Sequence, residues 1–243
     1  MFPIKDNIPH RESPFVTWAI ILINGLIFFF ELSLPRGVLE RFILHFGMVP
    51  ARYTNPAWAL SQGLSPMNLF PFLSSIFLHG GWMHFLGNMW SLWLFGDNVE
   101  DRVGHFRFLV FYLLCGLLAG VTHFIFNPTS RMPTIGASGA IAGVMGAYFI
   151  MFPTARVITL VPIFFLPYFV EIPAVVFFFF WFLSQLYGGM FSLLLPQGVG
   201  GIAWWAHIGG FVFGIVLVPF FRKRRRAYRP YYLDEMYYKR FIL

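Results

Sequence analysis

The sequence predicts an all-α membrane protein, a bundle of six transmembrane helices. Only 11% of its 243 residues are charged and 58% are hydrophobic, whereas a soluble domain carries about 25% charged residues. The hydrophobic residues form long runs, and about 20 are needed for a helix to cross a bilayer. These runs lack the short alternating pattern of a membrane β-barrel. The composition therefore excludes a soluble domain.

Six apolar segments are candidates for these helices. The fourth is short, which predicts a helix that begins below the membrane surface, where protein or a water-filled cavity covers its first backbone groups. Another apolar stretch, residues 157–170, contains Pro162 and Pro167, which fit a span poorly. We expect an interfacial loop there, because a seventh span would put His207 at the opposite end of its helix. The six predicted spans are residues 15–34, 82–98, 106–126, 138–152, 172–193 and 202–221.

The distribution of basic residues predicts the orientation of these spans. Of the 17 Lys and Arg residues, only Arg36, Arg41, Arg52 and Arg131 fall on the side opposite the two termini. Basic residues accumulate on the cytoplasmic side of membrane proteins, so both termini are expected in the cytoplasm. Because the sequence shows no transit-type N-terminal extension, we expect a bacterial inner membrane.

The segments outside the spans differ in character. The first external loop, residues 35–72, holds Tyr53, Trp58 and scattered arginines, and predicts amphipathic helices at the outer interface. We divide the chain into a membrane core, residues 1–221, and a basic, tyrosine-rich cytoplasmic tail, residues 222–243. The basic run that opens this tail directly follows a span, which favours anionic lipid over nucleic acid as its partner. Cys115 is the one cysteine, so an intramolecular disulfide is excluded.

Polar residues converge at the outer ends of three predicted spans. The second, fourth and sixth spans all begin on the outer side, and polar groups inside a membrane are functional candidates. Ser138 begins the fourth span, and His207 lies about five residues into the sixth, a depth of roughly 8 Å. His84 and Asn88, near the start of the second, are four residues apart and share a helical face.

Small residues predict how these helices pack. Glycines separated by three residues allow two helix backbones to approach closely in lipid. We therefore expect the fourth and sixth spans to lie close enough for Ser138 to hydrogen-bond with His207. The glycines in question are Gly139 and Gly143 in the fourth span and Gly210 and Gly214 in the sixth.

Three ordered sequence blocks resemble a known family. The blocks are His79…His84-Xaa3-Asn88, then Gly136-Ala137-Ser138-Gly139, then Ala206-His207-Ile208-Gly209-Gly210-Xaa3-Gly214. Together they resemble the signature of rhomboid intramembrane serine proteases, over nearly the whole chain as a six-span core.

This resemblance implies an enzyme without a metal or cofactor that cleaves other membrane proteins within their transmembrane segments. It implies that Ser138 is the nucleophile and His207 its general base. His84, Asn88 and the backbone N–H of Ser138 stabilise the oxyanion, and the remaining motif residues, Gly136 and His79 among them, support the site.

The chain departs from the family pattern at two positions. Many rhomboids carry a Trp-Arg pair in the first external loop, where this chain has Ala51-Arg52. Some carry a tyrosine one turn after the serine, packed on the histidine, and this chain has Ala142 there. What orients His207 is therefore open.

Three other functions are alternatives to this interpretation. A catalytically inactive rhomboid-like protein that binds transmembrane helices is the main alternative, although such relatives typically lose the motif residues. A transporter is disfavoured because we find no internal repeat. A metal or haem protein is disfavoured because the histidines are too scattered along the predicted spans for one site; they are His79, His84, His105, His123 and His207.

Overall fold

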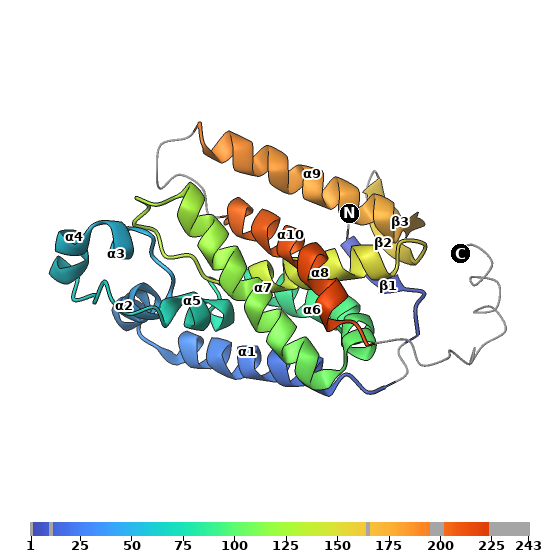
Figure 1. The fold of residues 1–243 in the computed structure, drawn as a ribbon, viewed down its shortest axis with the longest axis horizontal. Coiled ribbons are helices and arrows are strands. Elements are labelled where there is room, and N and C mark those ends of the chain that lie inside the picture. Colours follow the sequence, from blue (N-terminus) through green and yellow to red (C-terminus); the bar gives the residue numbers. More distant parts are fainter. Residues whose placement is uncertain (1, 10–11, 164–165, 195–201, 224–243) are drawn as a thin grey trace.

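The protein is a helical bundle with a small sheet at one end and a group of short helices at the other (Figure 1). The structure is a computed structural model, and it describes residues 2–9, 12–163, 166–194 and 202–223. Helices occupy all six predicted segments. They are α1 (Phe15–Ser33), α6 (Trp82–Val103), α7 (His105–Phe126), α8 (Ser138–Met151), α9 (Ala174–Ser192) and α10 (Trp204–Phe221).

Four of these helices, α1, α7, α9 and α10, are long and apolar enough to cross a membrane. The chain is therefore an integral, multi-pass membrane protein, as the sequence predicts. Helix α6 ends in charged residues, and α8 has only 14 residues. Large apolar side chains on α1 and α9, such as Leu26 and Phe180, are exposed on the outside of the bundle, as lipid-facing residues would be.

Helix α8 forms the centre of the bundle. Every residue from Gly139 to Tyr148 is buried, and the surrounding helices include α6, α7, α9 and α10 (Figure 1). Burial of α8 from its second residue onward is consistent with the prediction that its first backbone groups are covered by protein.

The close contact between α8 and α10 depends on glycine. A methyl group added to Gly210 would overlap the carbonyl oxygen of Gly139, and one added to Gly214 would overlap that of Gly143. Each of these backbones therefore occupies the space that a side chain would need. Small residues at such positions permit the van der Waals contact that holds helices together in lipid.

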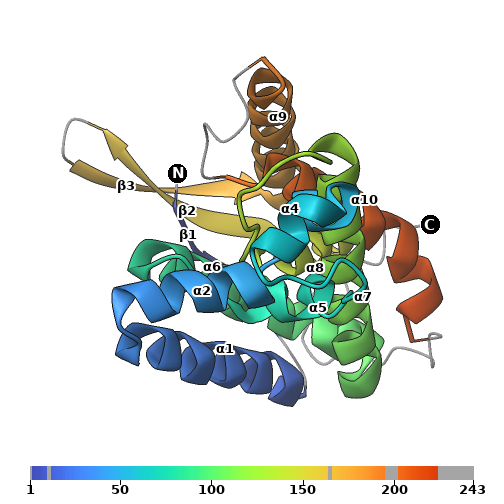
Figure 2. The same cartoon turned by 90° about the vertical axis from the view of Figure 1, so that its left-hand side faces the viewer.

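The prediction of an all-α fold is wrong in one region. Residues 157–170, expected to be a loop, belong to strands β2 (Arg156–Ile163) and β3 (Leu166–Pro173), which form an antiparallel hairpin. The N-terminal strand β1 (Phe2–Asp6) pairs with β2, so the sheet order is β1-β2-β3. Figure 2 shows the hairpin projecting away from the helices.

The composition of this hairpin explains the wrong prediction. Pro162 pairs with Pro167 near one end of the ladder, where two missing N–H donors interrupt few of its hydrogen bonds. The β-branched residues of β2 that precede Pro162 favour a strand. The side chains from Leu166 to Glu171 are exposed, so β3 lacks the alternation that marks a half-buried strand. The hairpin excludes a seventh spanning helix.

Asp6 anchors the sheet to the helices. Its Oδ2 accepts hydrogen bonds from Asn98 Nδ2 at 2.7 Å and from the Tyr148 hydroxyl at 2.5 Å. Burial raises the pKa of the Asp6 carboxyl to about 6, although the Tyr148 hydrogen bond opposes this shift. A second link is the indole of Trp90, which donates to the Pro3 carbonyl.

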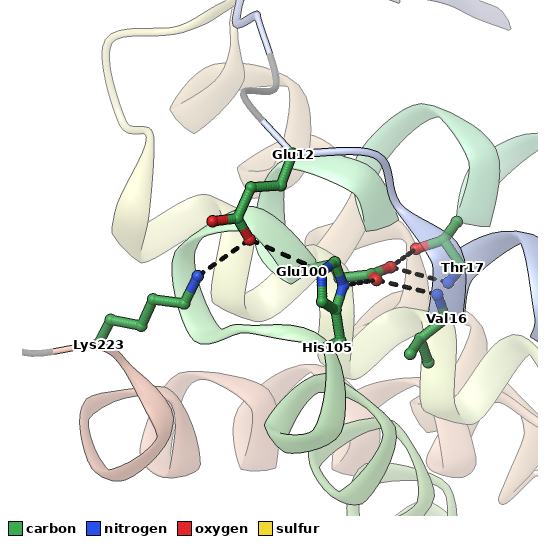
Figure 3. A network of polar contacts seen from close by, with 6 residues as sticks. All are labelled: Glu12, Val16, Thr17, Glu100, His105 and Lys223. Carbon is green, nitrogen blue, oxygen red and sulfur yellow. Dashed lines mark hydrogen bonds and ion pairs between the residues drawn. The ribbon is translucent and has the colours of Figure 1, made fainter.

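Glu100 holds the start of α1 against α6 and α7 (Figure 3). This completely buried carboxylate accepts from the backbone N–H groups of Val16 and Thr17 at 2.9 and 2.8 Å and from the Thr17 hydroxyl. It therefore satisfies two donors in the first turn of α1, which have no partner within the helix. His105 connects Glu100 to Glu12, and Glu12 also contacts Lys223 at the end of α10.

The first loop contains several short helices. Arg52 is buried and donates to the carbonyls of Ser65 and His45, so it ties distant parts of the loop together. The helices of this loop are α2 (Arg36–Phe46), α3 (Ala51–Thr54), α4 (Pro56–Ser61) and α5 (Pro71–Ser74), followed by a 3-10 turn, Ser75–Phe77. The predicted tail, residues 222–243, lies outside the described residues except for Arg222 and Lys223.

Replacing Gly214 by alanine is expected to destabilise the bundle by about 1–3 kcal/mol, because the new methyl group overlaps the α8 backbone. Thermal unfolding in detergent measures the effect. Gly37→Ala in α2 is the matched control, since nothing lies within 4 Å of its added methyl group. Equal stability of the two variants would contradict the close α8–α10 contact.

Stability is expected to fall as pH rises between 3.8 and about 6 through the titration of Asp6. The pKa of this group is higher in the folded protein than in the unfolded chain, so the folded state binds the proton more tightly. Asp6→Asn should remove this part of the pH dependence. Melting temperatures of both proteins across this range test it, and parallel curves would argue against a buried, titrating Asp6.

Candidate active site

Ser138 is the first residue of α8, and the preceding segment is held by the first loop. Thr134 and Met48 form a β-bridge, and Gly136 N–H donates to the Ser75 carbonyl at 2.9 Å. Gly136 has φ +124°, a conformation that side-chain-bearing residues rarely adopt. The Ser138 N–H lies at the helix N-terminus, where backbone N–H groups have no intrahelical acceptor and the helix dipole is positive.

His207 lies beside this serine. Its Nε2 is 2.7 Å from Ser138 Oγ, within hydrogen-bond distance. The opposite ring nitrogen, Nδ1, is 2.8 Å from the side-chain oxygen of Gln185 on α9. The imidazole is therefore contacted at both nitrogens, by residues from two different helices.

Sequence reasoning missed Gln185. It contacts the histidine in a chain that has Ala142 where some family members have a tyrosine. The available signal was an amide within the otherwise apolar fifth span, because polar groups in such segments are functional candidates. That signal does not say which neighbour the amide meets.

His84 and Asn88 lie next to the backbone that precedes Ser138. A methyl group built on Gly136 would come 2.6 Å from His84 Nε2 and 3.6 Å from Asn88 Nδ2. The Gly80 N–H points at His84 Nδ1 at 3.4 Å, which leaves Nε2 to carry the ring proton. Asn88 Nδ2 is buried and has no hydrogen-bond partner among the described residues. Two side-chain donors thus face the same small region as the start of α8.

Among the described residues, no hydrogen bond joins the His79 side chain to Ser138 or His207, and its ring packs against His84. Its ring centroid lies 5.2 Å from that of His84 and meets Phe85 edge-on, while its backbone N–H donates to Glu31. Burial, and secondarily the nearby His84, lowers the pKa of His79 to about 4. The ring is therefore neutral near pH 7.

The predicted glycines lie behind the site. Gly139 and Gly143 of α8 meet Gly210 and Gly214 of α10, as described above, and so bring Ser138 and His207 together. Among the described residues, no group of three or more His, Cys, Asp or Glu side chains is placed to hold a metal ion. His105 and His123 lie at opposite ends of α7.

A family model described as the Rhomboid domain matches residues 66–224 of this chain. The chain belongs to the rhomboid family. The matched region contains His84, Asn88, Ser138, Gln185 and His207, whereas α1 to α4 and the strand β1 of this rhomboid precede it.

Several curated relatives align with this rhomboid. The chloroplastic rhomboid-like protein 11 of Arabidopsis thaliana is 26% identical over 140 residues, 57% of this chain and 43% of the relative. The rhomboid protease GluP of Bacillus subtilis is 33% identical over 143 residues, 56% of this chain and 27% of the relative. The mitochondrial presenilin-associated rhomboid-like protein A of Danio rerio is 27% identical over 165 residues, which cover 64% of this chain and 38% of the relative. The chain thus spans less than half the length of each of these three relatives.

Proposed function

We propose that this rhomboid is an intramembrane serine endopeptidase that hydrolyses transmembrane segments of other membrane proteins near the outer leaflet. The observation that carries the proposal is the 2.7 Å separation of His207 Nε2 and Ser138 Oγ. Covalent catalysis requires a nucleophile within hydrogen-bond distance of a base, and a third group that orients this base. The similarity to GluP, which is named as a protease, supports the same reaction.

The proposed acylation step uses both residues. His207 Nε2 takes the proton of the Ser138 hydroxyl while Oγ bonds to the scissile carbonyl carbon. The resulting tetrahedral oxyanion lies against the Ser138 N–H and the side-chain donors of His84 and Asn88. The imidazolium then gives its proton to the leaving nitrogen, the C–N bond breaks, and an acyl-enzyme remains.

Water completes the reaction. His207 removes a proton from a water molecule as that water attacks the ester carbonyl, and the proton then returns to Ser138 Oγ. A cavity of about 20 Å³ lies beside Ser138, lined in part by Ser75, Gly136 and Ala206. This volume exceeds the ~10–15 Å³ that one water molecule needs, and several of the lining groups are polar.

The proposed substrate class follows from the apolar surface of the bundle. An apolar groove of about 540 Å³ is lined by residues of α6, α1 and β1, such as Leu86, Ile21 and Phe2. An apolar segment suits such a surface better than a soluble peptide does. Because a regular helix hides its peptide bonds, we expect substrates that unwind easily at helix-breaking residues near the outer boundary.

The membrane arrangement of this enzyme is part of the proposal. We propose six spans, with α6 and α8 added to the four long apolar helices, in a core of residues 1–221 followed by a tail of residues 222–243. Both termini would lie in the cytoplasm, with the sheet on that side and the helices of the first loop and residues 157–170 at the two interfaces. A bacterial inner membrane is our proposed location, although relatives include chloroplastic and mitochondrial proteins.

Ser138→Ala and His207→Ala are expected to abolish cleavage of a reconstituted transmembrane substrate that contains a helix breaker. Ser91→Ala and His45→Ala are the matched controls, since these side chains bond only to nearby carbonyls of their own helices. A fluorophosphonate should label the wild type at Ser138 but not His207→Ala. A folded wild type that neither cleaves nor reacts would favour the inactive helix-binding alternative.

Asn88→Ala is expected to lower kcat by about 10²–10³-fold with little change in KM, because this donor acts on the developing oxyanion. Steady-state kinetics on the same substrate measure both constants, with Ser91→Ala on the same helix as the control. A raised KM at unchanged kcat would assign Asn88 to substrate binding instead.

A further inference from the structure

Gln185 has an environment that a merely structural amide would not need. It lies on α9, a helix otherwise exposed to lipid over much of its surface, yet only 6% of Gln185 is exposed. Its side-chain oxygen lies 2.8 Å from His207 Nδ1, on the far side of the ring from Ser138. The amide therefore meets the one nitrogen of His207 that does not face the serine.

The neighbouring residue fixes which end of the amide faces His207. The Ser184 hydroxyl donates its proton to the Trp181 carbonyl at 2.6 Å, so its oxygen can only accept a further bond. The Gln185 nitrogen lies 3.0 Å from this oxygen and 3.4 Å from the same Trp181 carbonyl. Because the Ser184 and Trp181 oxygens both act as acceptors here, the end of the Gln185 amide that faces them must be the NH₂ group. The carbonyl end of the amide consequently points at the imidazole.

The orientation of the amide determines the tautomer of the histidine. A carbonyl oxygen only accepts, so His207 Nδ1 must carry the proton and donate it to Gln185 Oε1. In the neutral ring, Nε2 then holds a lone pair and accepts from the Ser138 hydroxyl. The opposite tautomer would present an N–H to Ser138 and leave the base unable to take its proton.

We propose that Gln185 is a positioning residue that holds His207 in the base-competent tautomer, with Ser184 selecting the amide orientation. This inference rests on the proposed protease function. It gives the site a neutral third member on α9, in place of the carboxylate of a serine protease triad and of the tyrosine that this chain lacks at Ala142. Because the amide is uncharged, it orients the ring without favouring its protonated form.

Two substitutions separate positioning from packing. Gln185→Leu removes the acceptor at similar size, and we expect kcat to fall about 10²-fold with little change in KM, the lower end of what a positioned base contributes. Gln185→Glu keeps an acceptor but introduces charge. An ionised carboxylate favours the protonated ring, so the acid limb of kcat/KM should move to higher pH while activity is retained above it.

The controls use matched changes. Gln62→Leu replaces an exposed glutamine of the first loop and should leave kcat unchanged. Ser184→Ala frees the amide to flip, and we expect a loss smaller than that of Gln185→Leu. His84 and His123 are the titratable groups that interact electrostatically with His207, and they are the same in every variant, so a shift between pH profiles reports position 185.

The experiment measures substrate cleavage and the rate of fluorophosphonate labelling of Ser138 against pH, for reconstituted wild type and each variant. The proposal is overturned if Gln185→Leu retains wild-type kcat or if the Gln185→Glu profile coincides with that of the wild type, while cleavage and its dependence on Ser138 persist. Should Gln185→Leu fail to fold, the Gln185→Glu profile decides alone. An unreactive wild type would instead overturn the proposed function, and this inference with it.

Discussion

The backbone contact between α8 and α10 is the constraint on which the site depends. The backbones of Gly139 and Gly143 occupy the space that side chains on Gly210 and Gly214 would need. Lipid supplies no hydrophobic force between helices, so this contact has to come from close van der Waals packing. It sets the distance between the first residue of α8 and the first turns of α10, and thereby the 2.7 Å separation of Ser138 and His207.

Two groups of buried polar side chains can be compared, one near the ends of α1 and β1 and one around Ser138. Glu100 and Asp6, near the sheet, each accept several hydrogen bonds and tie α1, α6, α8 and β1 together. Around Ser138 the donors are less completely used: within the described part of the chain, buried Asn88 Nδ2 has no partner. Leaving a buried donor unpaired costs about 1–3 kcal/mol, and the oxyanion of the proposed reaction would give this donor an acceptor.

Part of the fold and site was predictable because the relevant signals are local. Runs of apolar residues identify the six helices, since span length follows from bilayer thickness. The spacing of His84 and Asn88 places them on one face, and the glycine pattern indicates which helices pack closely. The sheet was missed because β1 and β2 lie far apart in the chain, and because β3 has no buried face to produce alternation.

The sequence by itself determined a helical membrane protein, the residues of the three motif blocks and the family to which they belong. Only the tertiary structure decided that the N-terminal strand pairs with the 156–173 hairpin and that Asp6 meets Tyr148. It also decided that Gln185 meets His207, with an amide orientation set by Ser184. The physical reason is the same in each case: hydrogen bonds between distant segments depend on how the elements are placed in space, and local patterns of hydrophobicity and spacing do not encode that placement.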